Sequence, residues 1–235
     1  MDLLGVIPAR GGSKAVPRKN LAPLDGRPLI GYTIEAALAS GVFSDLVVST
    51  DDEKIAAVAR EGGAQVPFAR PAHLATDAAE SLPVVLHALE HMEGKRGRAY
   101  EAVMMLQPTT PFRQAAQIVE AVRLLENDAS ADGVVSLIEV GGWHPFRMKR
   151  MVGKRAVNFI EQGFEDMRPR QVLPRVYIRS GAIYLIRRAS LLAHKALVGP
   201  ETLGLIVDER SALNIDTGRD LAMAELMLRE QAGAT

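Results

Sequence analysis

The chain has 235 residues, of which 48% are apolar and 24% charged, so it can bury a core without disulfides or structural metals. Lysine plus arginine balances aspartate plus glutamate, 28 against 28, which excludes a bulk field that would recruit nucleic acid or an anionic membrane. The absence of cysteine excludes disulfides and thiolate chemistry and suits a reducing compartment. We see no signal peptide and no apolar run near the roughly 20 residues of a membrane span, and we expect a cytoplasmic protein.

Short apolar segments alternate along most of the chain with segments of helical periodicity. We predict strands at 3–8, 45–49, 65–67, 102–106, 133–139, 182–186 and 203–207. We predict helices at 28–39, 52–61, 81–93, 114–127 and 217–229, of which the second is capped by Thr50 or Asp51 and the last by Thr217. This alternation predicts an α/β fold with a mostly parallel sheet covered by helices on both faces.

Residues 141–180 break the alternation. They are rich in arginine, proline and methionine, and they show no clear helical period. We interpret them as an extended arm or hairpin inserted within a single domain of residues 1–235. Because the arm has few core residues of its own, we expect it to cross to a partner subunit.

The loop that follows the first predicted strand, residues 9–20, combines glycines with basic side chains. Gly11 and Gly12 let the backbone approach an anion closely, and Ser13 adds a hydroxyl donor. The basic residues of the loop are Arg10, Lys14, Arg18 and Lys19. A loop after strand one of a parallel sheet lies at the edge where such folds bind ligands, so we predict a triphosphate site. Neither a Walker A motif nor G-x-G-x-x-G is present, which makes a dinucleotide site improbable.

This loop, with further motifs along the chain, resembles the acylneuraminate cytidylyltransferase (CMP-sialic acid synthetase) family. The motifs are IPARGGSKAVPRKN (7–20), STDD (49–52), RPAHLATD (70–77), LQPTTPFR (106–113), HP (144–145), PRQVLP (169–174), GAIY (181–184) and IDT (215–217). Each motif alone is weak, but their order and spacing together are specific.

The resemblance implies a Rossmann-like, three-layer α/β/α nucleotidyltransferase that forms a homodimer through the arm. It implies Mg²⁺-dependent transfer of CMP from CTP to the anomeric hydroxyl of a nine-carbon 2-keto sugar acid, with release of pyrophosphate. Positioning and electrostatic stabilisation carry most of such a reaction, and a basic loop can supply both.

The resemblance assigns roles to residues in both halves of the site. It implies that Arg10, Lys19 and Asp216 are catalytic. Those implied to bind the nucleotide are Arg10, Gly11, Gly12, Ser13, Lys14, Lys19, Asn20, Arg70, Asp77, Ala79 and Ser81. Those implied to bind the sugar acid are Gln107, Arg147, Arg170, Gln171, Tyr177 and Gly181. Taken without the resemblance, Arg70 reads as a turn arginine and Asp77 as a helix-capping carboxylate.

Three positions depart from the family's motifs, of which Thr110 in place of the usual serine is a mild change. Asn214-Ile215-Asp216 stands where the family usually has Asp-Ile-Asp, so Asp216 is the main Mg²⁺ ligand we expect and Asn214 a weaker second. Ser180 replaces the usual asparagine, so a contact with the sugar is expected to be missing or bridged by water. The sugar acid therefore stays open among neuraminate, its deaminated form, legionaminate and pseudaminate.

Three other functions compete with this one. The first is a cytidylyltransferase for another keto sugar acid, such as an eight-carbon one. The second is a non-catalytic nucleotide sensor with a weakened metal site. The third, a Rossmann oxidoreductase, is disfavoured because the glycine fingerprint is missing.

Overall fold

The computed structural model of the protein describes residues 1–13, 16–161, 163–164 and 166–233. Its elements are β1 (Leu3–Pro8), β2 (Pro23–Leu24), β3 (Arg27–Pro28), α1 (Leu29–Ser40), β4 (Asp45–Ser49), α2 (Glu53–Glu61), α3 (Ser81–Arg96), β5 (Ala102–Met105), α4 (Ala115–Asn127), β6 (Gly133–Glu139), β7 (Lys149–Val152), β8 (Arg155–Asn158), β9 (Tyr177–Arg187), α5 (Arg188–His194), β10 (Thr202–Ile206) and α6 (Gly218–Gly233). Short 3₁₀ helices occur at Lys19–Leu21, Ala72–Leu74, Pro145–Arg147 and Arg170–Val172.

Six strands form one sheet in the order β10-β6-β9-β5-β1-β4. β1 runs parallel to β4 and β5, and β10 runs parallel to β6, whereas β9 is antiparallel to both of its neighbours. The reversal follows from the connection, because β6 leads out into the arm and β9 leads straight back without a crossover helix. The sheet is mostly parallel, as the alternation predicts, and its carboxyl edge also receives the start of β9.

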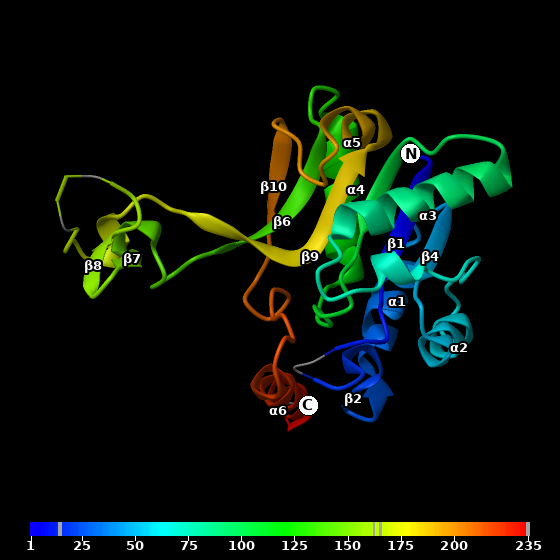
Figure 1. The fold of residues 1–235 in the computed structure, drawn as a ribbon, viewed down its shortest axis with the longest axis horizontal. Coiled ribbons are helices and arrows are strands. Elements are labelled where there is room, and N and C mark those ends of the chain that lie inside the picture. Colours follow the sequence, from blue (N-terminus) through cyan, green and yellow to red (C-terminus); the bar gives the residue numbers. More distant parts are fainter. Residues whose placement is uncertain (14–15, 162, 165, 234–235) are drawn as a thin grey trace.

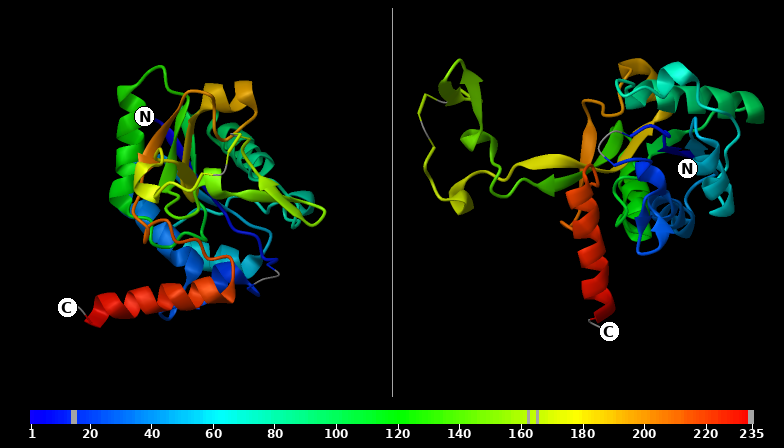
Figure 2. Two further views of the ribbon diagram at one scale, coloured as in Figure 1. Left: turned by 90° about the vertical axis from the view of Figure 1, so that its left-hand side faces the viewer. Right: turned by 60° about the horizontal axis from the view of Figure 1, so that its bottom comes forward.

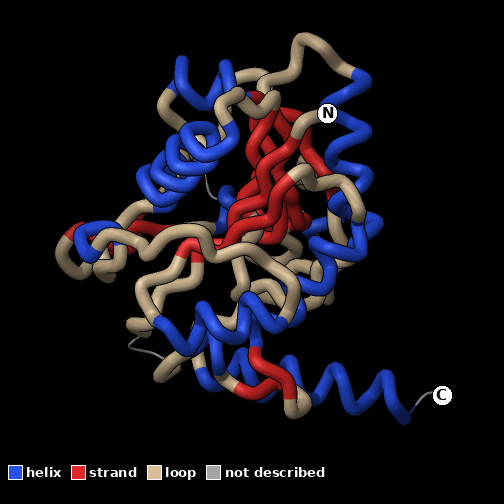
Figure 3. Tube along the Cα trace, turned by 90° about the vertical axis from the view of Figure 1, so that its right-hand side faces the viewer, coloured by secondary structure: helices blue, strands red, loops and turns tan. Residues whose placement is uncertain are grey.

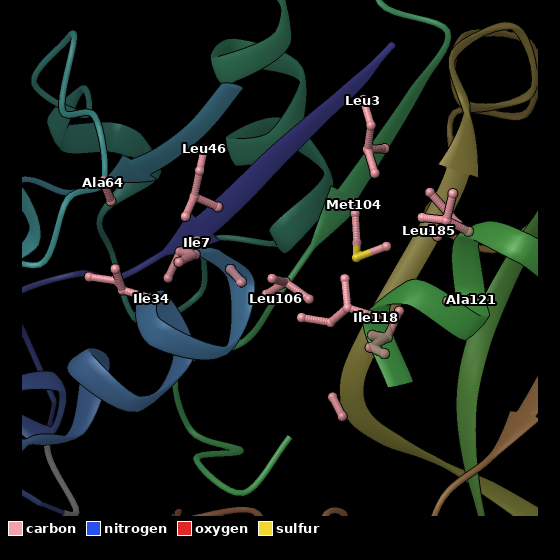
Figure 4. Close-up of a cluster of buried hydrophobic side chains, with 14 of the residues drawn as sticks. Leu3, Ile7, Ile34, Leu46, Ala64, Met104, Leu106, Ile118, Ala121 and Leu185 are labelled. Carbon is pink, nitrogen blue, oxygen red and sulfur yellow. The ribbon is translucent and has the colours of Figure 1, made fainter. Parts of the chain in front are cut away.

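Helices cover both faces of this sheet, which confirms the predicted α/β/α layers (Figure 3). Helices α1, α2 and α4 pack on one face, where Ile34 and Ile118 belong to the same buried cluster as Leu3 and Met104 (Figure 4). Helices α3 and α5 pack on the other face, where Leu89 and Leu191 belong to the same cluster as Val103. The strands are apolar on both faces because both are buried, and this is why they read as continuous apolar runs.

Residues 141–180 project from the sheet as an arm, with the β7–β8 hairpin at its far end (Figure 1). Of the sixteen exposed large apolar side chains among the described residues, ten lie in this arm. They are Trp143, Met148, Met151, Val152, Phe159, Ile160, Phe164, Met167, Val172 and Ile178. The C-terminal helix α6 also stands apart from the sheet (Figure 2) and packs through Ala224 near Leu24, Leu29 and Ile215.

Several local predictions differ from the structure. Asp52, rather than Thr50 or Asp51, caps α2, and its carboxylate accepts from the backbone of Lys54 and Ile55. The carboxylate of Asp51 is engaged elsewhere, by the backbone N–H of Gly11. The predicted strand at 65–67 reduces to a single bridge between Gln65 and Val47. The Thr217 cap is as predicted, since Thr217 and Asp220 exchange hydrogen bonds at the start of α6.

Candidate functional site

A cavity of about 390 Å³ lies at the carboxyl edge of the sheet, where β1 and β5 end and α3 begins. Eleven of the predicted site residues line it: Arg10, Gly12, Ser13, Lys19, Asn20, Arg70, Ala79, Ser81, Gln107, Asn214 and Asp216. Pro8, Glu80, Val84, Pro108 and Thr109 complete its walls. Segments far apart in the sequence therefore meet here, because the ends of parallel strands share one edge.

The two glycines of the loop after β1 have different surroundings. The backbone N–H of Gly11 donates to the Asp51 carboxylate at 2.9 Å, and a Cβ on Gly11 would lie 2.8 Å from the Cβ of Asp52. Gly11 is therefore required by the close approach of the α2 N-terminus, and its N–H is already engaged. Gly12 lines the cavity with open space around its Cα. Lys14 lies outside the described residues.

Asn20 connects the two ends of the loop after β1. Its side chain is 7% exposed, and its amide donates to the carbonyl of Arg10 at 2.9 Å. This bond ties the end of the loop back to its beginning. The two described ends of the loop are thus held by the side chains of Asn20 and Asp51, and Arg10 and Lys19 lie at these two ends.

Two cations of the loop are paired with carboxylates around the cavity. Arg10 lies 2.8 Å from the carboxylate of Asp77, which is not itself a lining residue, and Lys19 Nζ lies 2.9 Å from that of Asp216. Each pair joins the first loop to a segment distant in sequence. These carboxylates occupy the positions at which a polyanion would meet the same cations, so a bound triphosphate has to displace or join them.

Arg70 forms part of the cavity wall, although its side chain is mostly buried. It is 6% exposed, and its Nε donates to the Ser49 hydroxyl at 3.1 Å while its Nη2 donates to the Ser49 carbonyl. Burial lowers the pKa of the Arg70 guanidinium to about 10, and the negative charge of Asp51 partly opposes this. The side chain is therefore anchored to the end of β4 rather than free in solvent, unlike an ordinary turn arginine.

Asn214 and Asp216 offer oxygen ligands to a hard cation. The amide of Asn214 donates to the Asp216 carboxylate, and the buried Oδ1 of Asn214 has no hydrogen-bond partner. The described residues contain no group of three or more His, Cys, Asp or Glu side chains that could hold a metal. One carboxylate and one orphaned amide oxygen suit Mg²⁺, which takes its remaining ligands from substrate phosphates and water.

Gln107 and Gly181 lie against each other at this edge. Gly181 has a φ of +81°, and a Cβ there would lie 2.7 Å from the side-chain oxygen of Gln107. The adjacent Ser180 is 7% exposed and turns its hydroxyl into the sheet, where it donates to Ser136 at 2.8 Å. Its hydroxyl is therefore engaged inside the sheet.

The other residues predicted for the sugar acid lie on the arm and do not line this cavity. Arg170 and Gln171 line a second cavity of about 450 Å³ at the base of the arm. Arg147 donates to the carbonyl of Arg168 at 2.6 Å, and Tyr177 begins β9. Within one chain, then, the structure does not bring these four residues to the cavity.

His144 connects two segments of the chain at the base of the arm. Its Nδ1 accepts from the backbone N–H of Phe146 at 3.2 Å, and its Nε2 lies 3.0 Å from the carbonyl of Pro174. These contacts fit the neutral tautomer that carries its proton on Nε2.

We expect the distal arm to loosen in acid because of one ion pair, in which the carboxylate is buried and the guanidinium is half exposed. The carboxylate of Asp166 is 0% exposed and accepts two hydrogen bonds from the guanidinium of Arg168, which lowers its pKa from 3.8 to about 2. A depressed folded-state pKa gives stability that is present above pH 4 and lost as the pH falls towards 2. Fluorescence of Trp143, the single tryptophan, should change across this window in the wild type.

The Asp166→Asn variant should lack that transition, because no carboxylate remains to titrate. If the wild type and the variant show the same acid transition in Trp143 fluorescence, the Asp166–Arg168 pair does not hold the arm.

Sequence reasoning assigned no role to Arg113 and Thr109. Arg113 is 3% exposed and contacts the backbone that carries Gln107. Thr109 accepts at 2.7 Å from the backbone N–H of Ile215, which fixes the Asn214–Asp216 segment beside the loop after β5. Both lie in the motif LQPTTPFR, but nothing in a linear pattern reveals that an arginine is buried.

The fold and the cavity together define a nucleotidyltransferase-type α/β domain, with its cations gathered where the parallel strands end. Residues 4–168 match the family described as Cytidylyltransferase. The chain belongs to that family, as the resemblance of its motifs predicts. No helix among the described residues is both long enough and apolar enough to traverse a bilayer.

Characterised relatives and a solved structure are similar over most of the chain. N-acylneuraminate cytidylyltransferase of Escherichia coli O18:K1:H7 is 34% identical over 94% of this chain, which spans 51% of that protein. CMP-N,N'-diacetyllegionaminic acid synthase of Legionella pneumophila is 33% identical, with 97% of both chains covered. The structure of CMP:2-keto-3-deoxy-manno-octonic acid synthetase complexed with CTP has a TM-score of 0.72 over 98% of this chain and 100% of that one, at 17% identity, and confirms the fold.

Proposed function

We propose that the protein transfers CMP from CTP to the anomeric hydroxyl of a nine-carbon 2-keto sugar acid of the sialic acid type. The cavity at the sheet edge carries this proposal, because Arg10, Ser13 and Lys19 converge there opposite Asp216. Relatives named for acylneuraminic and diacetyllegionaminic acids support a substrate of this class. We propose that residues 1–235 act as one domain with residues 141–180 as an insertion.

In this reaction an oxygen–phosphorus bond forms and another breaks. The anomeric hydroxyl attacks the α-phosphorus of CTP, the bond from that phosphorus to the bridging oxygen breaks, and pyrophosphate leaves with the electron pair. Arg10 and Lys19 lie where they can neutralise charge on the phosphates. Asn20, Arg70, Asp77, Ala79 and Ser81 border the place that we assign to the nucleoside.

The donor set of Asn214 and Asp216 suits Mg²⁺, and we propose these residues as its protein ligands. Bound Mg²⁺ supplies positive charge to the phosphates and fixes their orientation. Lys19 is paired with Asp216 in the present structure, so the two side chains already bring the cationic and the anionic parts of the site together.

Pyrophosphate release from CTP tests the activity when it is measured against a panel of sugar acids. The panel contains N-acetylneuraminate, its deaminated form, legionaminate, pseudaminate and an eight-carbon keto acid. We expect release with at least one nine-carbon acid. Release with only the eight-carbon acid would move the proposal to that substrate, and CTP binding without any release would favour a nucleotide sensor.

We propose that the protein is a homodimer in which each arm completes the partner's site. Arg147, Arg170 and Tyr177 lie away from the cavity of their own chain, and the arm exposes many large apolar side chains. A concentration of exposed apolar side chains of this kind favours an interface. A second copy would cover it and bring cationic side chains to the sugar half of the cavity.

Mixing two inactive variants tests this arrangement. Lys19→Met removes a cavity residue and Arg170→Met removes an arm residue, so each alone should be nearly inactive. Re-associated mixtures should regain about a quarter of wild-type activity, because half of the dimers are mixed and one site in each is intact. If the mixture stays inactive, or if a fully active protein sediments as a monomer, each chain builds its site alone.

We also propose the cytoplasm as the place of action. A cysteine-free chain is suited to a reducing compartment, although it does not require one. Immunoblotting of cell fractions tests this, and recovery of the protein with the membrane fraction would contradict it.

A further inference from the structure

Arg113 is a buried cation for which the reaction outlined above has no use. It is 3% exposed, and within the described residues the structure records no ion pair for it. Burial lowers the pKa of its guanidinium to about 9. A charge held in the interior without a counter-charge is costly unless its donors are satisfied, so the contacts of Arg113 identify what it serves.

The guanidinium donates four hydrogen bonds, all to neutral acceptors. Its Nη2 donates to the carbonyl of Gln107 at 2.7 Å and to the hydroxyl of Thr110 at 2.6 Å. Its Nη1 donates to the hydroxyl of Thr33 on α1 at 3.1 Å. Its Nε donates to the carbonyl of Ala182 on β9 at 2.5 Å. One rigid planar group thus joins the loop after β5, helix α1 and the returning strand β9.

Two of these acceptors flank the contact between Gln107 and Gly181. The carbonyl of Gln107 belongs to the residue whose side chain lines the cavity, and Ala182 directly follows Gly181. There is no room between Gly181 and Gln107 for even a methyl group, because a Cβ would lie 2.7 Å from the Gln107 side-chain oxygen. A small shift of either backbone would therefore change where the Gln107 amide points.

The far side of β9 is held independently. Ser136 on β6 accepts from the backbone N–H of Ile183 and from the Ser180 hydroxyl, each at 2.8 Å. This buried hydroxyl pair lies at the irregularity between Val135 and Leu137, where the register of β6 and β9 shifts. β9 is thus fixed by β6 on one side and paired with β5 on the other, and where the β5 pairing ends, at Met105 and Tyr184, Arg113 joins β9 to the loop that carries Gln107.

We propose that Arg113 is a positioning residue for the sugar-acid half of the site, which acts by holding Gln107 in register with Gly181. The proposal rests on the proposed function and on the role in sugar-acid binding that the family resemblance implies for Gln107. It assigns to Arg113 no contact with either substrate. Loss of the Arg113 guanidinium should therefore raise the KM for the sugar acid and leave binding of CTP unchanged.

The test compares KM values for the two substrates in Arg113→Met and Arg113→Lys. Misplacement of a substrate-contacting side chain should raise the KM for the sugar acid by about ten- to a hundredfold. The KM for CTP should stay within about twofold. Lysine keeps the charge but cannot make the hydrogen bonds of the planar guanidinium. Arg113→Lys should therefore also raise the KM for the sugar acid and not that for CTP, and it replaces Arg113→Met in the test if that variant folds poorly.

Arg187 offers a matched control. It lies at the other end of β9, and its guanidinium donates to the backbone carbonyls of Leu125, Asp128 and Ala131 without approaching the cavity. Arg187→Met should lower the melting temperature and leave both KM values unchanged. Equal shifts in both KM values, or the same shifts in Arg187→Met, would mean that Arg113 only stabilises the fold.

A double-mutant cycle with Gln107→Ala gives the deciding readout. If Arg113 acts through Gln107, Arg113→Lys should add almost nothing to the sugar-acid KM once Gln107 is alanine. An undiminished effect in that background would overturn the proposal, as would an unchanged sugar-acid KM in an active Arg113 variant. A wild type that releases no pyrophosphate with any of the sugar acids would instead remove the proposed function, and the role of Arg113 with it.

Discussion

Replacing Asp216 with alanine is expected to lower kcat by on the order of a thousandfold, because a preorganised electrostatic contribution to the transition state is lost. Asp216 supplies the carboxylate of the Asn214–Asp216 pair that we assign to Mg²⁺, and it also holds Lys19 at 2.9 Å. Pyrophosphate release measured across a Mg²⁺ titration checks this. Added Mg²⁺ should not restore the variant.

Asn214→Asp provides the opposing control. It adds a second carboxylate at the position where the amide oxygen of Asn214 is buried without a partner. We expect turnover that equals or exceeds that of the wild type, with half-saturation at a lower Mg²⁺ concentration. Wild-type turnover in Asp216→Ala would remove this residue from the mechanism.

Replacing Lys19 with methionine is expected to lower kcat by about a hundredfold or more, since the charge opposite the reacting phosphates disappears. The change also removes the cation with which the Asp216 carboxylate is paired in the present structure. Single-turnover kinetics at saturating CTP separates the chemical step from binding. Lys19→Arg should keep part of the rate because it keeps the charge.

Arg18 gives a control from the same loop. It carries the same charge one residue earlier, is exposed, and does not line the cavity. Arg18→Met should therefore change kcat by less than about twofold. If Arg18→Met and Lys19→Met reduced kcat equally, the loop would act through its total charge rather than through the placement of Lys19.

Local sequence signals identified the sheet well. The strands Leu3–Pro8, Asp45–Ser49 and Gly133–Glu139 have the predicted bounds because each contains a short, mostly apolar run whose central residues are buried. The start of β9 at Tyr177 was not predicted, since its first residues leave the covered sheet and carry exposed side chains. Helix α5 was missed because it has only seven residues and follows β9 directly, without a loop between them.

The capping of α2 shows why neighbouring carboxylates are hard to assign. Asp51 and Asp52 both precede the helix, and sequence alone favoured Asp51 or Thr50. The carboxylate of Asp51 is engaged by Gly11, which is 40 residues away in sequence, and Asp52 caps instead. The hydrogen bond between Gly11 and Asp51 therefore determines which aspartate caps α2, and a local sequence pattern cannot reveal such a long-range contact.

The nucleotide half of the site was more predictable than the sugar half for a similar reason. Arg10, Lys19, Asn20 and Asp216 meet within one chain because strand ends converge at one edge of the sheet. Arg170 and the other arm residues lie away from that edge, which is why we propose that a second chain brings them to the site. The buried position of Arg113 was equally beyond the sequence, which shows an arginine but not its exposure.

A crystal structure of the protein with CTP would decide whether the loop after β1 is the triphosphate site. We predict that the phosphates lie between residues 9–20 and the start of α3, within hydrogen-bonding distance of Arg10, Ser13 and Lys19, and that the contacts of Asp77 and Asp216 with those cations are rearranged. Phosphates bound at the second cavity beside Arg170, or anywhere else away from this loop, would contradict the account.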